Sequence, residues 1–149
     1  MISKGKQSRP YLASTMGDPA GIGPEIIVKA LASPRVWRAC RPIVVGATSV
    51  FEQEVCRLQS QLRVVPLKGG HTYTEEKQIA KGCIPILDPL DKPLVRLQKG
   101  KAARVTGAAS LSCIETAVRL AQYGCVGGMV TAPINKEAIN LAGLSLIHI

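Results

Sequence analysis

Short apolar runs alternate with helical patterns in the first third of the chain. Residues 10–16 predict a short strand, and the glycine-rich segment 17–25 leads from it into a helix. Pro24 suits the first turn of that helix, because its missing N–H would have no intrahelical partner there. The compact apolar run at residues 42–46 is typical of a buried parallel strand. This part of the chain therefore predicts a strand, a glycine loop, a helix and a second strand.

A second helix is expected next, with Thr48 or Ser49 as its N-cap. Its apolar positions have helical spacing: Val50, Phe51, Val55, Leu58 and Leu62. Residues 63–67 predict a further short strand. Residues 83–87 predict an edge strand, because Pro85 cannot donate a hydrogen bond to a central ladder. The rest of the region from 68 to 100 is expected to be irregular.

The clearest helical pattern opens at Thr106 and is expected to end at Gly124. Residues 127–131 predict another buried strand, and Asn135 is expected to cap a last helix over residues 136–141. Strands that alternate with helices in this way predict an α/β fold with crossover connections.

Composition and charge narrow the function classes only partly. The five aromatic residues require an aliphatic core and leave almost no platforms for stacking single-stranded nucleic acid. The net charge is +9, but the basic residues are spread over the first nine residues, residues 35–41 and residues 92–104. This distribution suits small anions as well as DNA, and it also fits a plain solvated surface. We expect neither a nucleic-acid partner nor a membrane partner.

The five cysteines form no C-x-x-C pair, and their number is odd. Their apolar neighbours predict buried free thiols in a reducing compartment. No apolar run reaches the ~20 residues of a membrane span, and the amino terminus lacks the apolar segment of a secretory signal. A cytoplasmic location is therefore expected.

The glycine-rich segment 17–25 is the first candidate ligand loop. Glycines at a strand-to-helix turn let the backbone approach a ligand, and the helix amino terminus attracts anions. The candidate cofactor- or substrate-binding residues are Asp18, Gly21, Gly23 and Glu25. The two carboxylates suit ribose hydroxyls, a cation or a buried hydrogen-bond network better than a phosphate. The alternative is a tight turn with a capping acid. The dinucleotide fingerprint G-x-G-x-x-G is not matched.

A second candidate loop follows the strand predicted at residues 127–131. Thr131, Asn135 and Lys136 form a polar trio suited to a phosphorylated substrate. Alternatively, Asn135 is only a helix cap and Lys136 a surface charge. Ligands of open α/β sheets bind beyond the carboxyl ends of the strands, where both loops are expected.

At these two loops the sequence resembles a known family. Residues 15–26 and 130–137 are similar to signature segments of the 4-hydroxythreonine-4-phosphate dehydrogenase family, and residues 100–109 resemble the lead into its long helix. The matches are collinear and span nearly the whole chain. The first motif also resembles the glycine loop of isocitrate and isopropylmalate dehydrogenases, so the implied fold is their three-layer α/β sheet, here truncated.

The resemblance implies an enzyme of pyridoxal phosphate biosynthesis. Such an enzyme uses NAD or NADP to oxidise 4-phosphohydroxy-L-threonine to a 2-amino-3-oxo acid, which decarboxylates to 3-amino-2-oxopropyl phosphate. A divalent metal (Zn, Mg or Co) held by histidines polarises the hydroxyl, and the active site forms at a homodimer interface. Two alternatives stay open: a threonate or erythronate 4-phosphate dehydrogenase, and a phosphate acyltransferase of the same architecture.

The sequence departs from the family pattern after Gly143. The family's Gly-His-Thr motif and metal histidines would follow that point, but residues 144–149 do not match. We therefore expect an amino-terminal fragment without catalytic or metal residues, and no NAD reduction by the 149-residue chain. Its expected parts are a disordered tail (1–9), an α/β part that runs into the start of a second domain (10–143) and a non-family tail (144–149).

Both histidines of the chain lie outside the segments that resemble the family. His148 lies in the non-matching tail, and the triplet at residues 70–72 places His71 in the irregular region, so neither is predicted as a metal ligand. Gly127 and Gly128 stand where the family often has an acidic residue, which weakens the local match.

Overall fold

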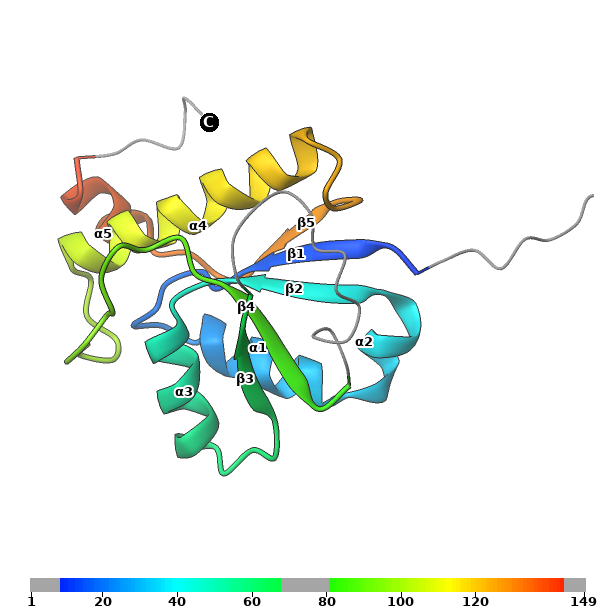
Figure 1. Cartoon of the computed structure of the whole chain (residues 1–149). Helices are drawn as coiled ribbons and strands as arrows, with labels where there is room; N and C mark the ends of the chain where they lie inside the picture. The colour runs from blue at the N-terminus through cyan, green and yellow to red at the C-terminus, as the bar shows by residue number, and fades with distance from the viewer. Residues whose placement is uncertain (1–8, 68–80, 144–149) are drawn as a thin grey trace, which may run out of the picture.

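A parallel sheet of five strands lies between two layers of helices (Figure 1). The computed structural model describes residues 9–67 and 81–143. The strands are β1 (Tyr11–Thr15), β2 (Arg41–Val45), β3 (Arg63–Pro66), β4 (Cys83–Leu87) and β5 (Met129–Thr131), in the order β3-β4-β2-β1-β5. The described helices are α1 (Gly23–Ala32), α2 (Pro34–Ala39), α3 (Thr48–Arg57), α4 (Arg104–Gln122) and α5 (Lys136–Leu141). This arrangement confirms the predicted α/β fold.

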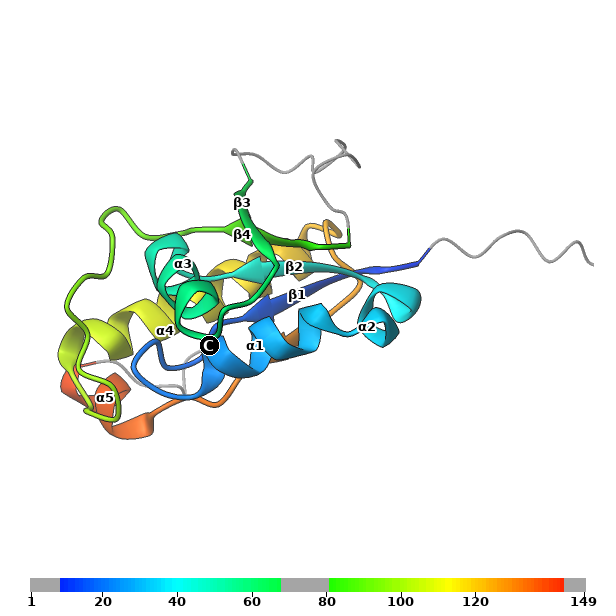
Figure 2. The ribbon, with the colours of Figure 1, turned by 90° about the horizontal axis from the view of Figure 1, so that it is seen from below.

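The helices divide between the two faces of the sheet. In Figure 1, α4 and α5 lie on one side, and α1, α2 and α3 lie on the other. Seen from below in Figure 2, α1 and α3 stand in front of the strands. Both faces of β1 and β2 are therefore covered, and Ala13, Ile43 and Val44 are fully buried. The core is aliphatic, as the composition predicts, with Phe51 and Trp37 as its buried aromatic side chains.

The prediction that residues 83–87 form an edge strand is wrong. Strand β4 lies inside the sheet, between β3 and β2. Pro85 is tolerated there because the ladder between β2 and β4 pairs only Val44 with Ile86 and Val45 with Leu87, and so begins one residue past the proline. Conversely, β5 is an edge strand rather than a buried one, and the Val130 side chain is 58% exposed.

Two helix predictions also need correction, and one helix was not predicted. Thr48 and Ser49 do not cap α3, whose N-cap is Ala47. The carboxylate of Asp88 takes that role by accepting a hydrogen bond from the Thr48 amide at 2.7 Å. Helix α4 begins at Arg104, two residues before Thr106. Helix α2 was not predicted, although Ser33 followed by Pro34 is a typical helix start.

The cysteines are free, but not all of them are buried. Cys40, Cys83 and Cys113 lie in the interior as expected, and burial raises the pKa of the Cys113 thiol to about 12. Cys56 is exposed on α3, and Cys125 is half-buried. Residues 1–8, His71 and residues 144–149 lie outside the described residues, so the predictions made for them stay predictions.

A glycine allows α4 and α5 to pack closely. A Cβ atom added at Gly107 would lie 2.6 Å from the backbone nitrogen of Ile139 and would overlap the carbonyl group of Ala138. No shift of a side chain could relieve that overlap, because the neighbouring atoms are backbone atoms of α5. The small residue is therefore required for the position of α5 and of the loop that precedes it.

We predict that Gly107→Ala destabilises the chain by roughly 1–3 kcal/mol in urea unfolding. At a helix position without such a contact, the same change would raise the free energy of unfolding by about 0.5–1 kcal/mol. Gly128→Ala is the matched control, because its new methyl group would meet only the Leu12 side chain, at 3.6 Å. An unfolding free energy of Gly107→Ala equal to or above that of the parent chain would contradict the packing argument.

Candidate functional site

The two candidate loops meet at one edge of the sheet. Strands β1 and β5 are parallel neighbours, so both loops leave the sheet at its carboxyl ends, as predicted. The amide of Asp18 donates to the carbonyl oxygen of Pro133 at 2.9 Å, and the amide of Ala132 donates to that of Thr15 at 3.2 Å. The backbones of the two loops are therefore joined directly.

This junction depends on a glycine at position 17. Gly17 has φ +69°, and a Cβ atom there would lie 2.8 Å from the carbonyl oxygen of Ala132 and overlap that of Pro133. Gly23 is also a packing glycine, because a Cβ atom would overlap the carbonyl oxygen of Met16. Both glycines are buried, so they bring α1 against the end of β1 and do not face solvent.

Asp18 forms the turn with which the glycine loop begins. Its side chain is 6% exposed and accepts a hydrogen bond from the Ala20 amide at 2.9 Å. Its carbonyl oxygen accepts another from the Gly21 amide at 3.0 Å. The first bond is that of an Asx turn, and the second is that of a β-turn. In this structure the Asp18 carboxylate therefore stabilises a tight turn, which is the alternative that the sequence left open for the loop.

The three polar residues of the second loop lie in different environments. Asn135 caps α5 by accepting a hydrogen bond from the Ala138 amide at 3.1 Å. Lys136 is the exposed first residue of α5. Thr131 lines an apolar hollow of about 320 Å³ beside Ile26 and Val130, on the α1 side of the sheet. Contact of these three residues with a ligand stays a prediction.

A hollow of about 300 Å³ whose lining includes three charged side chains lies beside the glycine loop. Three segments line it: the glycine loop with the start of α1, the end of α3, and the segment before α4. The lining residues are Ala20, Gly21, Ile22, Glu25, Arg57, Lys99 and Gly100. The third segment is fastened to the loop by a hydrogen bond from the Gly100 amide to the Ala20 carbonyl oxygen at 2.8 Å. Of the predicted candidates, the hollow brings together Gly21 and Glu25.

A buried carboxylate holds the two cations of this hollow. Glu54 on α3 is 2% exposed, and its Oε1 accepts from Arg57 Nη2 at 2.5 Å and from Arg57 Nε at 3.1 Å. Its Oε2 accepts from Lys99 Nζ at 3.3 Å. Burial alone would raise the pKa of Glu54, but the hydrogen bonds and charges of Arg57 and Lys99 outweigh it and lower the pKa below its ordinary value.

Glu25 completes the charge network on the solvent side. It pairs with Lys29 at 2.5 Å and with Arg57 Nη2 at 2.6 Å, and these two partners lower its pKa. In turn, the hydrogen bonds to Glu54 and Glu25 raise the pKa of Arg57. No sequence motif contains Glu54, Arg57 or Lys99, because tertiary packing alone brings these residues together.

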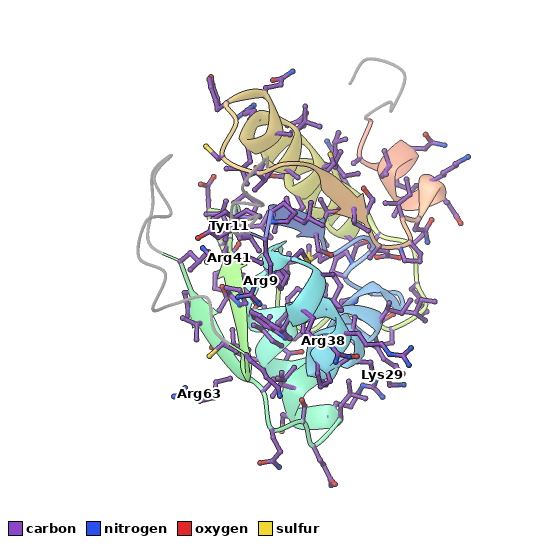
Figure 3. The ribbon with its side chains drawn as sticks, turned by 90° about the vertical axis from the view of Figure 1, so that its right-hand side faces the viewer. Arg9, Tyr11, Lys29, Arg38, Arg41 and Arg63 are labelled. Atoms are coloured by element: carbon purple, nitrogen blue, oxygen red, sulfur yellow. The ribbon has the colours of Figure 1, made fainter. Side chains whose placement is uncertain are left out.

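The opposite edge of the sheet carries a different surface. Figure 3 shows Arg9, Arg38, Arg41 and Arg63 on the side where the strands begin. The Arg41 guanidinium lies over the Tyr11 ring, 5.3 Å from its centroid. Arginines that are far apart in the sequence therefore face the same side of the molecule.

The described part of the chain contains neither a metal-binding cluster nor a membrane-spanning helix. No three His, Cys, Asp or Glu side chains lie close enough together to hold a metal ion. No helix in this part of the chain is long and apolar enough to cross a bilayer.

Residues 38–148 match the sequence profile of the family described as pyridoxal phosphate biosynthetic protein PdxA. The chain belongs to the PdxA family. A relative in Desulfosudis oleivorans named 4-hydroxythreonine-4-phosphate dehydrogenase is 40% identical over 136 residues, which cover 91% of this chain and 38% of the relative. A relative in Symbiobacterium thermophilum, provisionally named D-threonate 4-phosphate dehydrogenase, is 35% identical over 140 residues and is covered to 41%.

Solved structures of PdxA proteins have the same fold. The 4-hydroxythreonine-4-phosphate dehydrogenase of Burkholderia phymatum superposes with a TM-score of 0.79 at 30% identity, over 93% of this chain and 40% of its own. The Klebsiella pneumoniae enzyme of that name gives 0.79 at 32% identity, over 93% of this chain and 41% of its own. The chain thus spans about two fifths of the length of its PdxA relatives.

In this PdxA chain we predict that Glu54→Gln lowers the unfolding free energy by roughly 1–3 kcal/mol at neutral pH, because the three charge-assisted hydrogen bonds from Arg57 and Lys99 are weakened. Because the folded pKa of Glu54 is lowered, its contribution is complete above the ordinary value of 4.5. That contribution is lost as the pH falls through the lower folded value. Urea unfolding as a function of pH should therefore show a smaller acid-induced loss in Glu54→Gln.

Glu52→Gln is the matched control, since Glu52 is exposed two residues earlier on the same helix. It should retain both the stability and the acid-induced loss of the parent chain. Equal effects of the two substitutions would show that Glu54 has no special role.

Proposed function

We propose that the chain supplies the glycine-loop part of the active site of an NAD- or NADP-dependent dehydrogenase whose substrate is 4-phosphohydroxy-L-threonine. Membership of the PdxA family supports this proposal most directly, together with relatives that are named 4-hydroxythreonine-4-phosphate dehydrogenase. The position of both loops at the carboxyl ends of β1 and β5 supports it independently, since ligands of such sheets bind there. The proposal includes the homodimer, the cytoplasmic location and the divalent metal that the resemblance implies.

The reaction oxidises the secondary hydroxyl of the substrate. The hydroxyl loses its proton, and its carbon gives up a hydride. The resulting β-keto acid then loses carbon dioxide. A bound nicotinamide cofactor supplies the hydride acceptor. We assign no metal ligand to the described residues, because no suitable group of side chains is present among them.

The role proposed for this chain is to bind and orient ligands at the carboxyl edge. The cations Arg57 and Lys99, with the Ile22 amide beside them, form a donor set that suits phosphate groups, which both the cofactor and the substrate carry. The hydrogen bonds between Asp18 and Pro133 and between Gly100 and Ala20 fix the three backbone segments around that set. Such fixed donors orient a ligand without reorganisation.

The second candidate substrate is D-threonate 4-phosphate. The Symbiobacterium thermophilum relative favours it, because it is 35% identical to the chain and carries that provisional name. Both substrates are phosphorylated hydroxy acids, so the same phosphate-binding donors would serve either.

A chimaeric enzyme tests the proposal. Residues 1–143 would replace the matching part of the Desulfosudis oleivorans relative, whose remaining sequence would follow. We predict reduction of NAD or NADP, followed by absorbance, with 4-phosphohydroxy-L-threonine and a lower kcat/KM with D-threonate 4-phosphate. The intact relative is the positive control, and the 149-residue chain alone is expected to give no reduction. A folded chimaera that reduces neither cofactor with either substrate would contradict the proposed function.

A further inference from the structure

Arg57 and Lys99 are held in the hollow by the buried carboxylate of Glu54 on α3. The Glu54 carboxylate is 2% exposed, whereas the Arg57 and Lys99 side chains are each 51% exposed. A buried carboxylate is stable only when it is paired, so Glu54 keeps both cations at the end of α3. Their exposed halves line the hollow and are accessible to a ligand.

Arg57 has donors to spare for a further anion. Its Nε and Nη2 atoms bind Glu54, and Nη2 also binds Glu25. Within the described residues Nη1 makes no hydrogen bond, and a guanidinium carries five N–H donors. The planar fork of Arg can bind a phosphate through two parallel hydrogen bonds.

Glu25 occupies the place that such an anion would take. It is 31% exposed, and its bond to Arg57 joins two solvent-accessible groups. Ion pairs of that kind contribute little to stability. Because Glu25 also pairs with Lys29 one turn further along α1, it can leave Arg57 without losing its last partner.

The backbone beside the cations is also suited to an anion. Helix α1 has ten residues, and its N-cap, Ile22, provides no side-chain capping bond. The first N–H groups of a helix have no intrahelical partner, and the aligned peptide dipoles add positive potential there. Gly21 and Ile22 line the same hollow as Arg57 and Lys99. The Gly21 amide already donates to the Asp18 carbonyl oxygen and Pro24 has no N–H, so the Ile22 amide is the backbone donor beside the two cations.

We propose that this hollow is a phosphoryl-binding subsite in which Arg57 and Lys99 hold the phosphate and Glu25 is displaced onto Lys29. The ligand is a phosphomonoester or a diphosphate. This proposal rests on the proposed function only for the source of the phosphoryl group, which is either the substrate's phosphate or the cofactor's diphosphate. Glu54 is a positioning residue, since it acts through the two cations and does not touch the ligand.

Titration of the ¹⁵N-labelled chain tests the subsite without turnover. Glycerol 3-phosphate represents the phosphomonoester, and ADP-ribose represents the diphosphate of the cofactor. The amide signals of Gly21, Ile22 and Gly100 should shift with one of the two ligands. The tighter ligand identifies the source of the phosphate. Shifts confined to the amides around Arg38 and Arg41, at the opposite edge of the sheet (Figure 3), would overturn the proposal.

Two pairs of substitutions distinguish a specific subsite from nonspecific electrostatic attraction of anions. Lys99→Gln should weaken binding about tenfold, because a charge-assisted hydrogen bond is lost. Lys101→Gln makes the same change of charge at an exposed residue that does not line the hollow, and should have little effect. Equal weakening by both substitutions would overturn the proposal.

The second pair tests the displacement of Glu25. Glu25→Gln should tighten binding severalfold, because it removes the carboxylate that competes for Arg57. Glu52→Gln changes the charge equally at an exposed position on α3 and should not tighten binding. If Glu25→Gln binds no more tightly than Glu52→Gln, the proposed displacement is wrong. Thermal unfolding of each variant shows whether the fold is retained.

The outcomes also separate this subsite from the proposed function. An active chimaera combined with unchanged binding by Lys99→Gln would disprove the subsite alone. An inactive chimaera combined with specific loss of binding in Lys99→Gln would disprove the dehydrogenase function and leave the subsite in place.

Discussion

The parallel pairing of β1 with β5 is the constraint on which the site depends. It brings together two loops that are far apart in the sequence, and the hydrogen bond from the Asp18 amide to the Pro133 carbonyl oxygen joins them. The pairing is possible only because Gly17 has no side chain at the point where the two backbones meet. The junction therefore fixes the two candidate loops relative to each other.

A buried carboxylate places positive charge at this edge of the sheet. Glu54 is a buried carboxylate whose partners reach it from the end of α3 and from the segment before α4. The same ion pairs stabilise the fold and hold two cations beside the glycine loop. The opposite edge has its own basic surface, so net charge alone does not indicate where an anion binds (Figure 3). The difference lies in the shape of the hollow and in the donors at the start of α1.

Local patterns were sufficient to predict most elements of the fold. The strand, glycine loop and helix at the start of the chain and the Asn135 cap of α5 follow from turn and capping chemistry that lies within a few residues. Strand order was less accessible, because it depends on pairing between distant segments. Pro85 therefore suggested an edge strand, although the ladder between β2 and β4 begins just beyond it. The cap of α3 was missed for the same reason, since Asp88 comes from another part of the chain.

The residues of the candidate site likewise differ in whether a local motif contains them. The motif residues Gly21 and Glu25 were found from the sequence and do line the hollow. Asp18 and Asn135 were selected by the same motifs, but here their side chains form a turn and a helix cap. Arg57 and Lys99 belong to no motif, so only the three-dimensional structure could bring them into consideration.

Hydrogen–deuterium exchange tests most directly whether the carboxyl edge binds the ligands. The chain would be compared alone and with NAD plus 4-phosphohydroxy-L-threonine. Slower exchange of the amides at residues 20–25 and 99–101 is the predicted result. Protection confined to the opposite edge, at residues 35–41, or no protection at saturating ligand, would contradict the assignment of this edge as the ligand-binding face.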